Sequence, residues 1–291
     1  QRYPVRWLCW GSAALVLALA RILGKSAPFG VAFTAVAPFP LVLPSAIGGA
    51  VGYLLGGGMG GNFPLVGALL LTAILRWVIG PRWEKHRGWT GPLLAGGAVF
   101  LTGVAPLLYS SPLVYDVVIW VTQVVMGAAS ASFLERGTGA LRRRKAPADR
   151  LDATALTITG ALLLMGLDTV AAGGVTLGGV AAAAGVLFAA RVGGEGFSSV
   201  VGLVCGLAMG FATGDFPPAI TVYGLGGMLA GIFSAFGRTG SALAFLFTYG
   251  AISAMTAGST AGFVEVALAA FLFLMTPLPC FRLVAAALRP A

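Results

Sequence analysis

The chain has 291 residues, of which 58% are hydrophobic and only 9% are charged. Soluble globular domains carry about 25% charged residues, so this composition excludes a soluble domain and indicates a surface that meets lipid or other helices. The formal net charge of +9 is spread over short polar stretches without interleaved aromatic residues, so we expect no nucleic-acid binding.

Twelve apolar segments follow one another along the chain, and they predict an all-α, polytopic membrane bundle of about ten transmembrane helices. Several are shorter than the minimum of about 17 residues for a span. Pro38, Pro40 and Pro44 interrupt the second and third segments, which form either two thin spans or one re-entrant hairpin. The hairpin alternative reduces twelve segments to ten spans. The segments are residues 6–23, 28–43, 44–59, 63–80, 92–109, 113–134, 153–171, 177–191, 196–213, 217–236, 239–257 and 262–281.

Basic residues concentrate on the cytoplasmic side of membrane proteins. With the N-terminus in the cytoplasm, alternating spans place all but two of the 18 basic residues on the cytoplasmic side, the exceptions being Arg21 and Lys25. We therefore predict that both termini are cytoplasmic in a cell membrane. A basic cluster after the sixth segment either sets this topology or faces anionic lipid, where each charge contributes about 1 kcal/mol. The cluster consists of Arg142, Arg143, Arg144 and Lys145.

The two halves of the chain share a short motif. Gly-Asn-Phe-Pro at residues 61–64 recurs as Gly-Asp-Phe-Pro at residues 214–217, each time after a glycine-rich segment. We hypothesise a tandem repeat of parallel orientation; the alternative is chance similarity between glycine-rich apolar sequences. The predicted organisation is a first membrane half over residues 1–134, a basic cytoplasmic loop over 135–152 and a second membrane half over 153–291.

Glycine recurs at every fourth residue along one predicted helix in each half. Such a stripe lets a second backbone approach closely, which favours helix packing in lipid. The partner is either a helix of the same subunit or a neighbouring copy of the chain. The two stripes are Gly48, Gly52, Gly56 and Gly60 in the first half, and Gly202, Gly206, Gly210 and Gly214 in the second.

Ionisable residues within apolar segments are candidates for a functional role, because a charge in a bilayer is costly. Arg191 and Glu265 are the two that we select, with an intramembrane ion pair as one such role. Catalytic and metal-ligand patterns are not recognisable, and the single histidine, His86, falls in a basic loop. We therefore predict no catalytic residue, metal ligand or cofactor site in this segment.

Three glycine-rich stretches carry a resemblance to a known family. They are residues 26–33 (Ser-Ala-Pro-Phe-Gly-Val-Ala-Phe), residues 192–203 and residues 223–238, the last ending in Phe236-Gly237-Arg238. In this order they resemble the N-terminal membrane region of the stage II sporulation protein E (SpoIIE) family. The resemblance implies a bacterial sporulation protein with a multi-span membrane region, a central self-assembling region that meets the division protein FtsZ, and a C-terminal Ser/Thr phosphatase.

By the same resemblance, the phosphatase requires manganese or magnesium and dephosphorylates SpoIIAA at the asymmetric septum, which activates the forespore sigma factor. Because the sequence begins with Gln1 and ends at Ala291, we expect a piece of a longer protein from which the catalytic domain is absent. The expected function is membrane anchoring and positioning with self-association. The alternative is a small transporter or channel, favoured by the repeat and by the interrupted segments.

Overall fold

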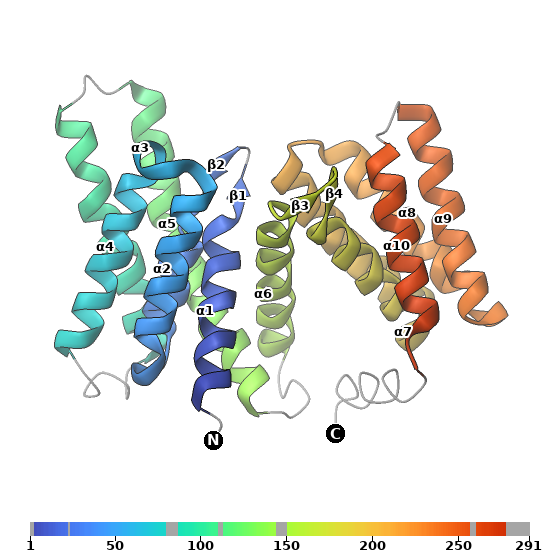
Figure 1. Ribbon diagram of the computed structural model, residues 1–291, viewed down its shortest axis with the longest axis horizontal. Helices are drawn as coiled ribbons and strands as arrows, with labels where there is room; N and C mark the ends of the chain where they lie inside the picture. Colours follow the sequence, from blue (N-terminus) through green and yellow to red (C-terminus); the bar gives the residue numbers. More distant parts are fainter. Residues whose placement is uncertain are drawn as a thin grey trace. The chain divides into compact units, whose positions relative to one another are not determined.

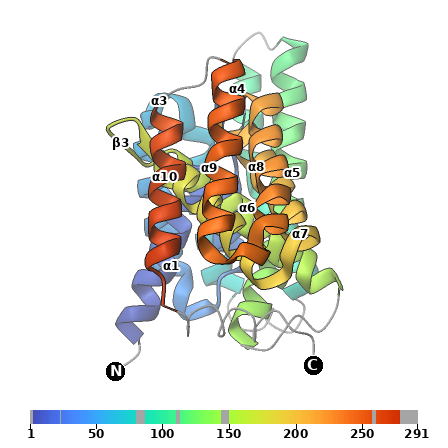
Figure 2. The same cartoon turned by 90° about the vertical axis from the view of Figure 1, so that its right-hand side faces the viewer.

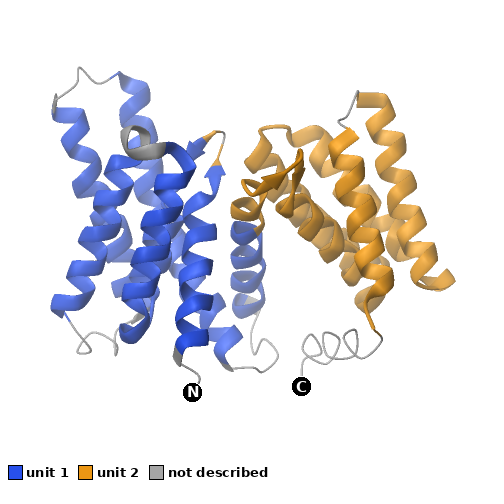
Figure 3. Cartoon of the chain, in the orientation of Figure 1, with its two compact units in different colours: residues 1–21, 25–143, 151–163 blue, residues 22–24, 144–150, 164–291 orange. Residues whose placement is uncertain are grey.

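A computed structural model describes residues 3–22, 24–79, 87–109, 113–143, 150–256 and 260–277. The chain divides into two compact units (Figure 3). Unit 1 consists of residues 1–21, 25–143 and 151–163, and unit 2 of residues 22–24, 144–150 and 164–291. The described part is almost entirely helical, which confirms the predicted all-α fold.

Unit 1 contains the elements of the first half of the chain and most of α6 (Figure 1). Its helices are α1 (Tyr3–Leu19), α2 (Phe29–Val36), the 3-10 turn η1 (Phe39–Leu41), α3 (Val42–Ile79), α4 (Arg87–Tyr109) and α5 (Val114–Arg143), followed by α6 (Arg150–Asp168). Two short strands, β1 (Arg21–Ile22) and β2 (Lys25–Ser26), pair between α1 and α2. Helix α1 packs along α3, and α4 packs along α5.

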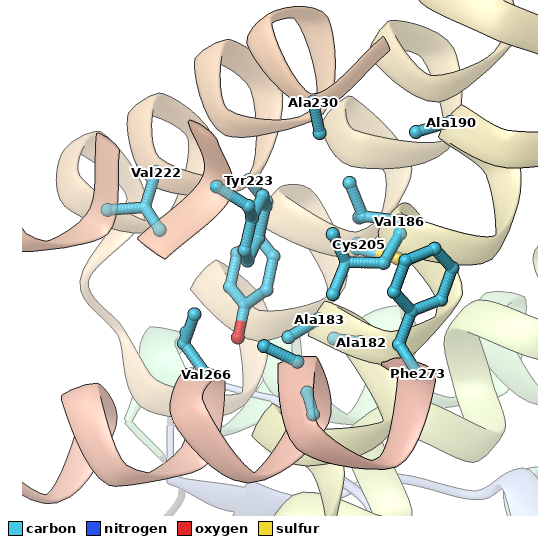
Figure 4. Close-up of a cluster of buried hydrophobic side chains, with 14 of the residues drawn as sticks. Ala182, Ala183, Val186, Ala190, Cys205, Val222, Tyr223, Ala230, Val266 and Phe273 are labelled. Carbon is cyan, nitrogen blue, oxygen red and sulfur yellow. The ribbon is translucent and has the colours of Figure 1, made fainter. Parts of the chain in front are cut away.

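Unit 2 is built from four long helices behind a small hairpin. Its elements are β3 (Ala171–Ala172), β4 (Val175–Thr176), α7 (Leu177–Thr213), α8 (Phe216–Ile232), the 3-10 turn η3 (Phe233–Phe236), α9 (Gly237–Thr256) and α10 (Thr260–Met275). Helix α9 packs against both α8 and α10, and the three run side by side (Figures 1 and 2). A core of small and aromatic residues fills the space between these helices and α7, with Tyr223, Phe245 and Phe273 as its largest members (Figure 4).

Seven stretches of helix in the described part are long and apolar enough to cross a membrane. They are Phe39–Gly57, Asn62–Ile79, Gly88–Leu108, Val114–Arg142, Leu151–Asp168, Leu177–Thr213 and Phe216–Thr256, and Pro4–Leu19 and Thr260–Met275 are shorter apolar helices. Two of these stretches, Phe39–Gly57 and Asn62–Ile79, share helix α3 and pack against each other, because a Cβ at Gly49 would lie 2.9 Å from the Leu69 Cδ1 atom and Asn62 Nδ2 donates to the Tyr53 carbonyl oxygen at 2.8 Å. A polytopic helical membrane bundle is therefore confirmed, with some predicted segments joined in one helix.

The second predicted segment contains only a short helix. Helix α2 has eight residues, all buried, and extends over about 12 Å, too little to cross a bilayer by itself. Pro38 and Pro40 end it and start the turn η1, because proline cannot continue a helix. The Tyr53 hydroxyl of α3 holds its first turn by donating to the Ala27 carbonyl oxygen at 3.0 Å and accepting from the Val31 amide at 3.4 Å. Of the two predicted segments at 28–43 and 44–59, the first is therefore too short to cross a bilayer as a helix, whereas the second lies largely within Phe39–Gly57, which is long and apolar enough to do so.

The segments predicted at 177–191 and 196–213 are two limbs of α7. They meet at Gly194, whose φ of 67° and ψ of −158° break the helix. Only glycine adopts such angles readily. Ser198 reinforces the kink, because its hydroxyl lies 2.8 Å from the Gly194 carbonyl oxygen and 2.7 Å from that of Gly227 on α8.

The predicted loop over residues 135–152 is corrected by the structure. Helix α5 continues through residues 135–143, and α6 begins at Arg150. Within this extension Gly137 and Ala140 are buried, whereas Arg136 and Arg142 are exposed, so these two arginines mark the solvent-facing side of a helix and not a loop. Gly137 brings the extension close to Ala155 of α6, because a Cβ at this position would lie 3.0 Å from the Ala155 carbonyl oxygen.

Both halves open with the same order of elements, a helix followed by a two-stranded hairpin and a second helix. The order α1, β1, β2, α2 corresponds to α6, β3, β4, α7, as a tandem repeat requires. The second copy of the motif lies where α7 gives way to α8, with Gly214 in the left-handed conformation at φ 88°. The first copy lies at the start of the stretch Asn62–Ile79, which follows the stretch Phe39–Gly57.

Candidate functional site

Unit 2 contains an open cavity of about 320 Å³ whose lining includes several polar side chains. Its wall is formed by the end of α6, the β3–β4 hairpin, the turn between α7 and α8, and helices α8, α9 and α10. This polar interior within otherwise apolar helices is the feature of the fold that best qualifies as a functional site. Its main polar groups are Asp168, Thr176, Asp215, Tyr223, Tyr249 and Glu265.

Glu265 of α10 binds the beginning of α7. Its Oε1 atom accepts a hydrogen bond of 2.6 Å from the Thr176 amide, and Thr176 caps α7 by accepting from the Gly179 amide at 3.0 Å. A carboxylate at a helix N-terminus is stabilised by the unpaired amides and the helix dipole. Gly179 is required here, because a Cβ at this position would overlap the Glu265 carboxylate. Glu265 thus fastens α10 to α7 across a separation of 89 residues from Thr176.

Asp168 lies beside Glu265 in a less favourable setting. It is the last residue of α6, where the helix dipole disfavours a negative charge. Its Oδ1 atom is enclosed and has no hydrogen-bond partner among the described residues. The Thr176 side chain interacts with both carboxyl groups. Two carboxyl groups at one cavity wall suit the uptake of a proton or of a cationic group, although no cluster of three metal-ligating residues occurs in the described ranges.

The Tyr223 side chain separates this cavity from the apolar core. It is 5% exposed, and Figure 4 shows its hydroxyl directed toward the α10 helix near Val266. The hydroxyl lies 3.5 Å from the Gly179 carbonyl oxygen, so it reaches the same helix start as Glu265. Sequence reasoning missed Tyr223 and Tyr249 as site residues, because an aromatic residue in an apolar helix carries no signal that separates core from cavity.

The second charged candidate lies elsewhere. Arg191 is exposed on α7, three residues before the kink at Gly194, and it does not line the cavity. No ion pair joins Arg191 or Glu265 to another residue within the described ranges. The structure therefore brings Glu265 together with Asp168 and not with Arg191.

The glycine stripes lie against helices of the same chain. A Cβ at Gly48 would overlap the Gly11 carbonyl oxygen of α1, and a Cβ at Gly52 would lie 2.8 Å from the Ala18 Cβ of α1. In unit 2, Gly202, Gly206 and Gly210 face Tyr223, Ile220 and Phe216 of α8 in the same way. These contacts lie within one subunit, which was one of the two alternatives.

Three members of the stripes differ from the rest. Gly56 has only an ordinary contact, with a Cβ position 3.6 Å from Leu19 Cδ2. The surroundings of Gly60 lie outside what the structure describes. Gly214 is a correction, because it caps α7 with a positive φ and a Cβ there would meet no atom within 4 Å. Its glycine serves the turn and not helix packing.

The predicted basic cluster is described only at its first residue. Arg142 is exposed on the last turn of α5. The Arg143 side chain, Arg144 and Lys145 lie outside the described residues. Contact of the cluster with lipid therefore stays a prediction.

Comparison with known proteins gives one match. A family model described as SpoIIE, N-terminal domain, matches residues 6–285. No curated protein and no solved structure matches the chain. The family match covers all described helices except the first residues of α1.

Proposed function

This chain belongs to the SpoIIE N-terminal domain family, and from this we propose that it positions a SpoIIE-like sporulation phosphatase in the membrane of the asymmetric septum. The observation that carries the proposal is the match over residues 6–285, which coincides with the apolar helices. In this proposal the phosphatase dephosphorylates SpoIIAA and activates the forespore sigma factor. Catalysis with manganese or magnesium, and contact with FtsZ, belong to parts of the protein outside this segment.

The proposed topology has both termini in the cytoplasm. In unit 1, the beginning of α1 and the end of α5 lie at the lower end of Figure 1, and the β1–β2 hairpin lies at the upper end. Arg6, Arg76, Arg136 and Arg142 belong to the start of α1 and the ends of α3 and α5 at the lower end, whereas only Arg21 and Lys25 belong to the hairpin. An excess of basic residues on one side supports a cytoplasmic lower end. The test introduces a cysteine at each terminus of the protein and treats intact cells with a thiol reagent that does not cross the membrane. Modification of either cysteine would contradict this topology.

Self-association is part of the proposed function. Confinement to a membrane patch raises the effective concentration of an attached enzyme, and oligomers are then favoured by mass action. The glycine stripes contact α1 and α8 of the same chain, so a contact between copies would use the exposed apolar faces instead. Large exposed side chains on α9 and α10, such as Phe247 and Phe271, supply such faces.

The test is replacement of this region by an unrelated membrane anchor with the same number of spans and the same terminal orientation. We expect the chimaera to dephosphorylate purified SpoIIAA at the normal rate but to lose septal placement or correct timing of sigma-factor activation. A matched control carries the natural region with a substitution at an exposed position of α4 outside these faces, Leu101→Met. Normal septal placement and timing of the chimaera would contradict a specific role and leave only anchoring.

The second candidate function is a small transporter or channel, because the cavity of unit 2 places Glu265 and Asp168 among membrane helices. Purified protein in liposomes with an imposed pH or cation gradient tests this function. Flux that is lost in Glu265→Gln and retained in Arg191→Gln supports a transporter. Liposomes with protein that are as tight as empty liposomes contradict it.

A further inference from the structure

A second, larger cavity lies in unit 1 at the end of its helix bundle. It has a volume of about 710 Å³ and is formed by the start of α4, the last turns of α5 and the start of α6. We call it the terminal groove, and its charged and aromatic lining residues are Trp89, Glu135, Arg136, Arg142 and Asp152. It is separate from the polar cavity of unit 2, with which it shares no residue.

One face of α5 forms the floor of the terminal groove. Ser132, Glu135, Gly139 and Arg142 follow one another at intervals of three or four residues, which places them on one side of a helix. A Cβ at Gly139 would meet no atom within 4 Å, so open space lies between the charged residues before and after it. The groove is therefore a hollow between side chains and not a packed contact.

The charged groups of the groove differ in whether they already interact with other residues of the protein. Glu135 and Asp152 each interact with another part of the protein. Arg136 and Arg142 are exposed, and within the described ranges neither has a hydrogen bond or ion pair. Two guanidinium groups at a hollow thus retain their donors for a ligand, and a guanidinium matches the geometry of a phosphate.

We propose that the terminal groove binds the phosphate head group of an anionic phospholipid. The groove lies where the apolar stretches Gly88–Leu108 and Val114–Arg142 have their basic ends, at the depth of lipid head groups. Trp89 is 82% exposed at its rim, and tryptophan is enriched at the membrane interface. Basic pockets between transmembrane helices on the cytoplasmic side bind such head groups. A free phosphate shares this chemistry, but the position beside the bilayer favours the lipid. The proposal is independent of the phosphatase function.

The experiment measures binding of short-chain phosphatidylglycerol to the purified full chain in a non-ionic detergent, by microscale thermophoresis. Phosphatidylcholine with the same acyl chains and inorganic phosphate are the comparison ligands. We expect saturable binding of phosphatidylglycerol alone. Loss of both charges in Arg136→Gln/Arg142→Gln weakens it about 30-fold, at about 1 kcal/mol for each charge and 1.4 kcal/mol for each factor of ten.

Two matched controls separate the groove from general charge and general bulk. Arg191→Gln removes an exposed arginine of unit 2 and should leave binding unchanged. Gly139→Leu fills the groove without changing charge and should weaken binding at least tenfold, whereas Gly97→Leu places the same side chain on an exposed, open position of α4 and should not. Equal binding by the wild type and the double arginine variant overturns the proposal, as does equal binding by the two leucine variants. Binding of inorganic phosphate as tight as that of phosphatidylglycerol overturns the assignment to lipid.

Discussion

The contact between α7 and α8 depends on glycine, and Gly206 offers its sharpest test. A Cβ at this position would lie 2.8 Å from the Ile220 Cα and 2.9 Å from the Ala219 carbonyl oxygen. Ordinary contact of a Cβ begins at 3.4 Å, so Gly206→Ala forces the two backbones apart by about half an ångström. Overpacking of this kind costs about 1–3 kcal/mol, and backbone atoms cannot rotate away as a side chain can. We expect about 2 kcal/mol for alanine and more for Gly206→Leu.

The assay is reversible unfolding by sodium dodecyl sulfate in mixed micelles, followed by tryptophan fluorescence. Gly185→Ala is the matched control, because it lies on α7 and a Cβ there would meet no atom within 4 Å. Since alanine favours helix over glycine by up to about 1 kcal/mol, this control should unfold at the same or a higher detergent fraction. Gly206→Ala with a midpoint equal to that of Gly185→Ala would refute the argument that α7 and α8 meet backbone to backbone.

Three further changes test other contacts in the same unfolding assay. Tyr53→Phe removes the buried hydroxyl that donates to the Ala27 carbonyl oxygen and should cost about 1–2 kcal/mol; an unchanged midpoint would show that this bond does not fix α2. Glu265→Leu leaves the Thr176 amide without its acceptor and should cost about 2 kcal/mol more than Glu265→Gln, which retains an oxygen; equal stabilities would contradict a role in holding α10. Gly214→Ala places a side chain at φ 88° and should cost about 1–2 kcal/mol. The same change at the helical position Gly185 should not lower the midpoint, and equal midpoints for the two variants would contradict the role of Gly214 in the turn.

The approximate positions of most apolar helices were predictable from the sequence because the apolar runs are long and strongly bounded. The predicted break between the segments at 177–191 and 196–213 corresponds to the kink at Gly194. The short α2 was not predictable, since Pro38 and Pro40 signal an interruption without showing which side keeps a full helix. The loop predicted over residues 135–152 was wrong for residues 135–143 for another reason. The charged residues were interpreted as a loop, although Arg136 and Arg142 lie on the exposed side of the last turns of α5.

The candidate site was predictable only in part. Glu265 was selected as an ionisable residue in an apolar segment, but nothing in the sequence shows that it shares a cavity with Asp168. Their meeting depends on the β3–β4 hairpin, in which Ala171 pairs with Thr176 and turns the start of α7 toward α10. Hairpins of two residues per strand leave almost no periodic signal. Long-range pairing of this kind follows from the fold and not from local pattern.

The two glycine stripes repeat in the sequence, but they pack against helices that do not correspond to each other. In the first half, Gly52 lies against α1, whereas in the second half Gly206 lies against α8. A smooth helical face specifies how closely a neighbour approaches but not which neighbour it is. In unit 2 the residues that face the stripe belong to α8, which begins at Phe216 shortly after α7 ends at Thr213. Residues 151–163 of α6, the counterpart of α1, belong to unit 1. The second half therefore uses a different helix to cover the same kind of stripe.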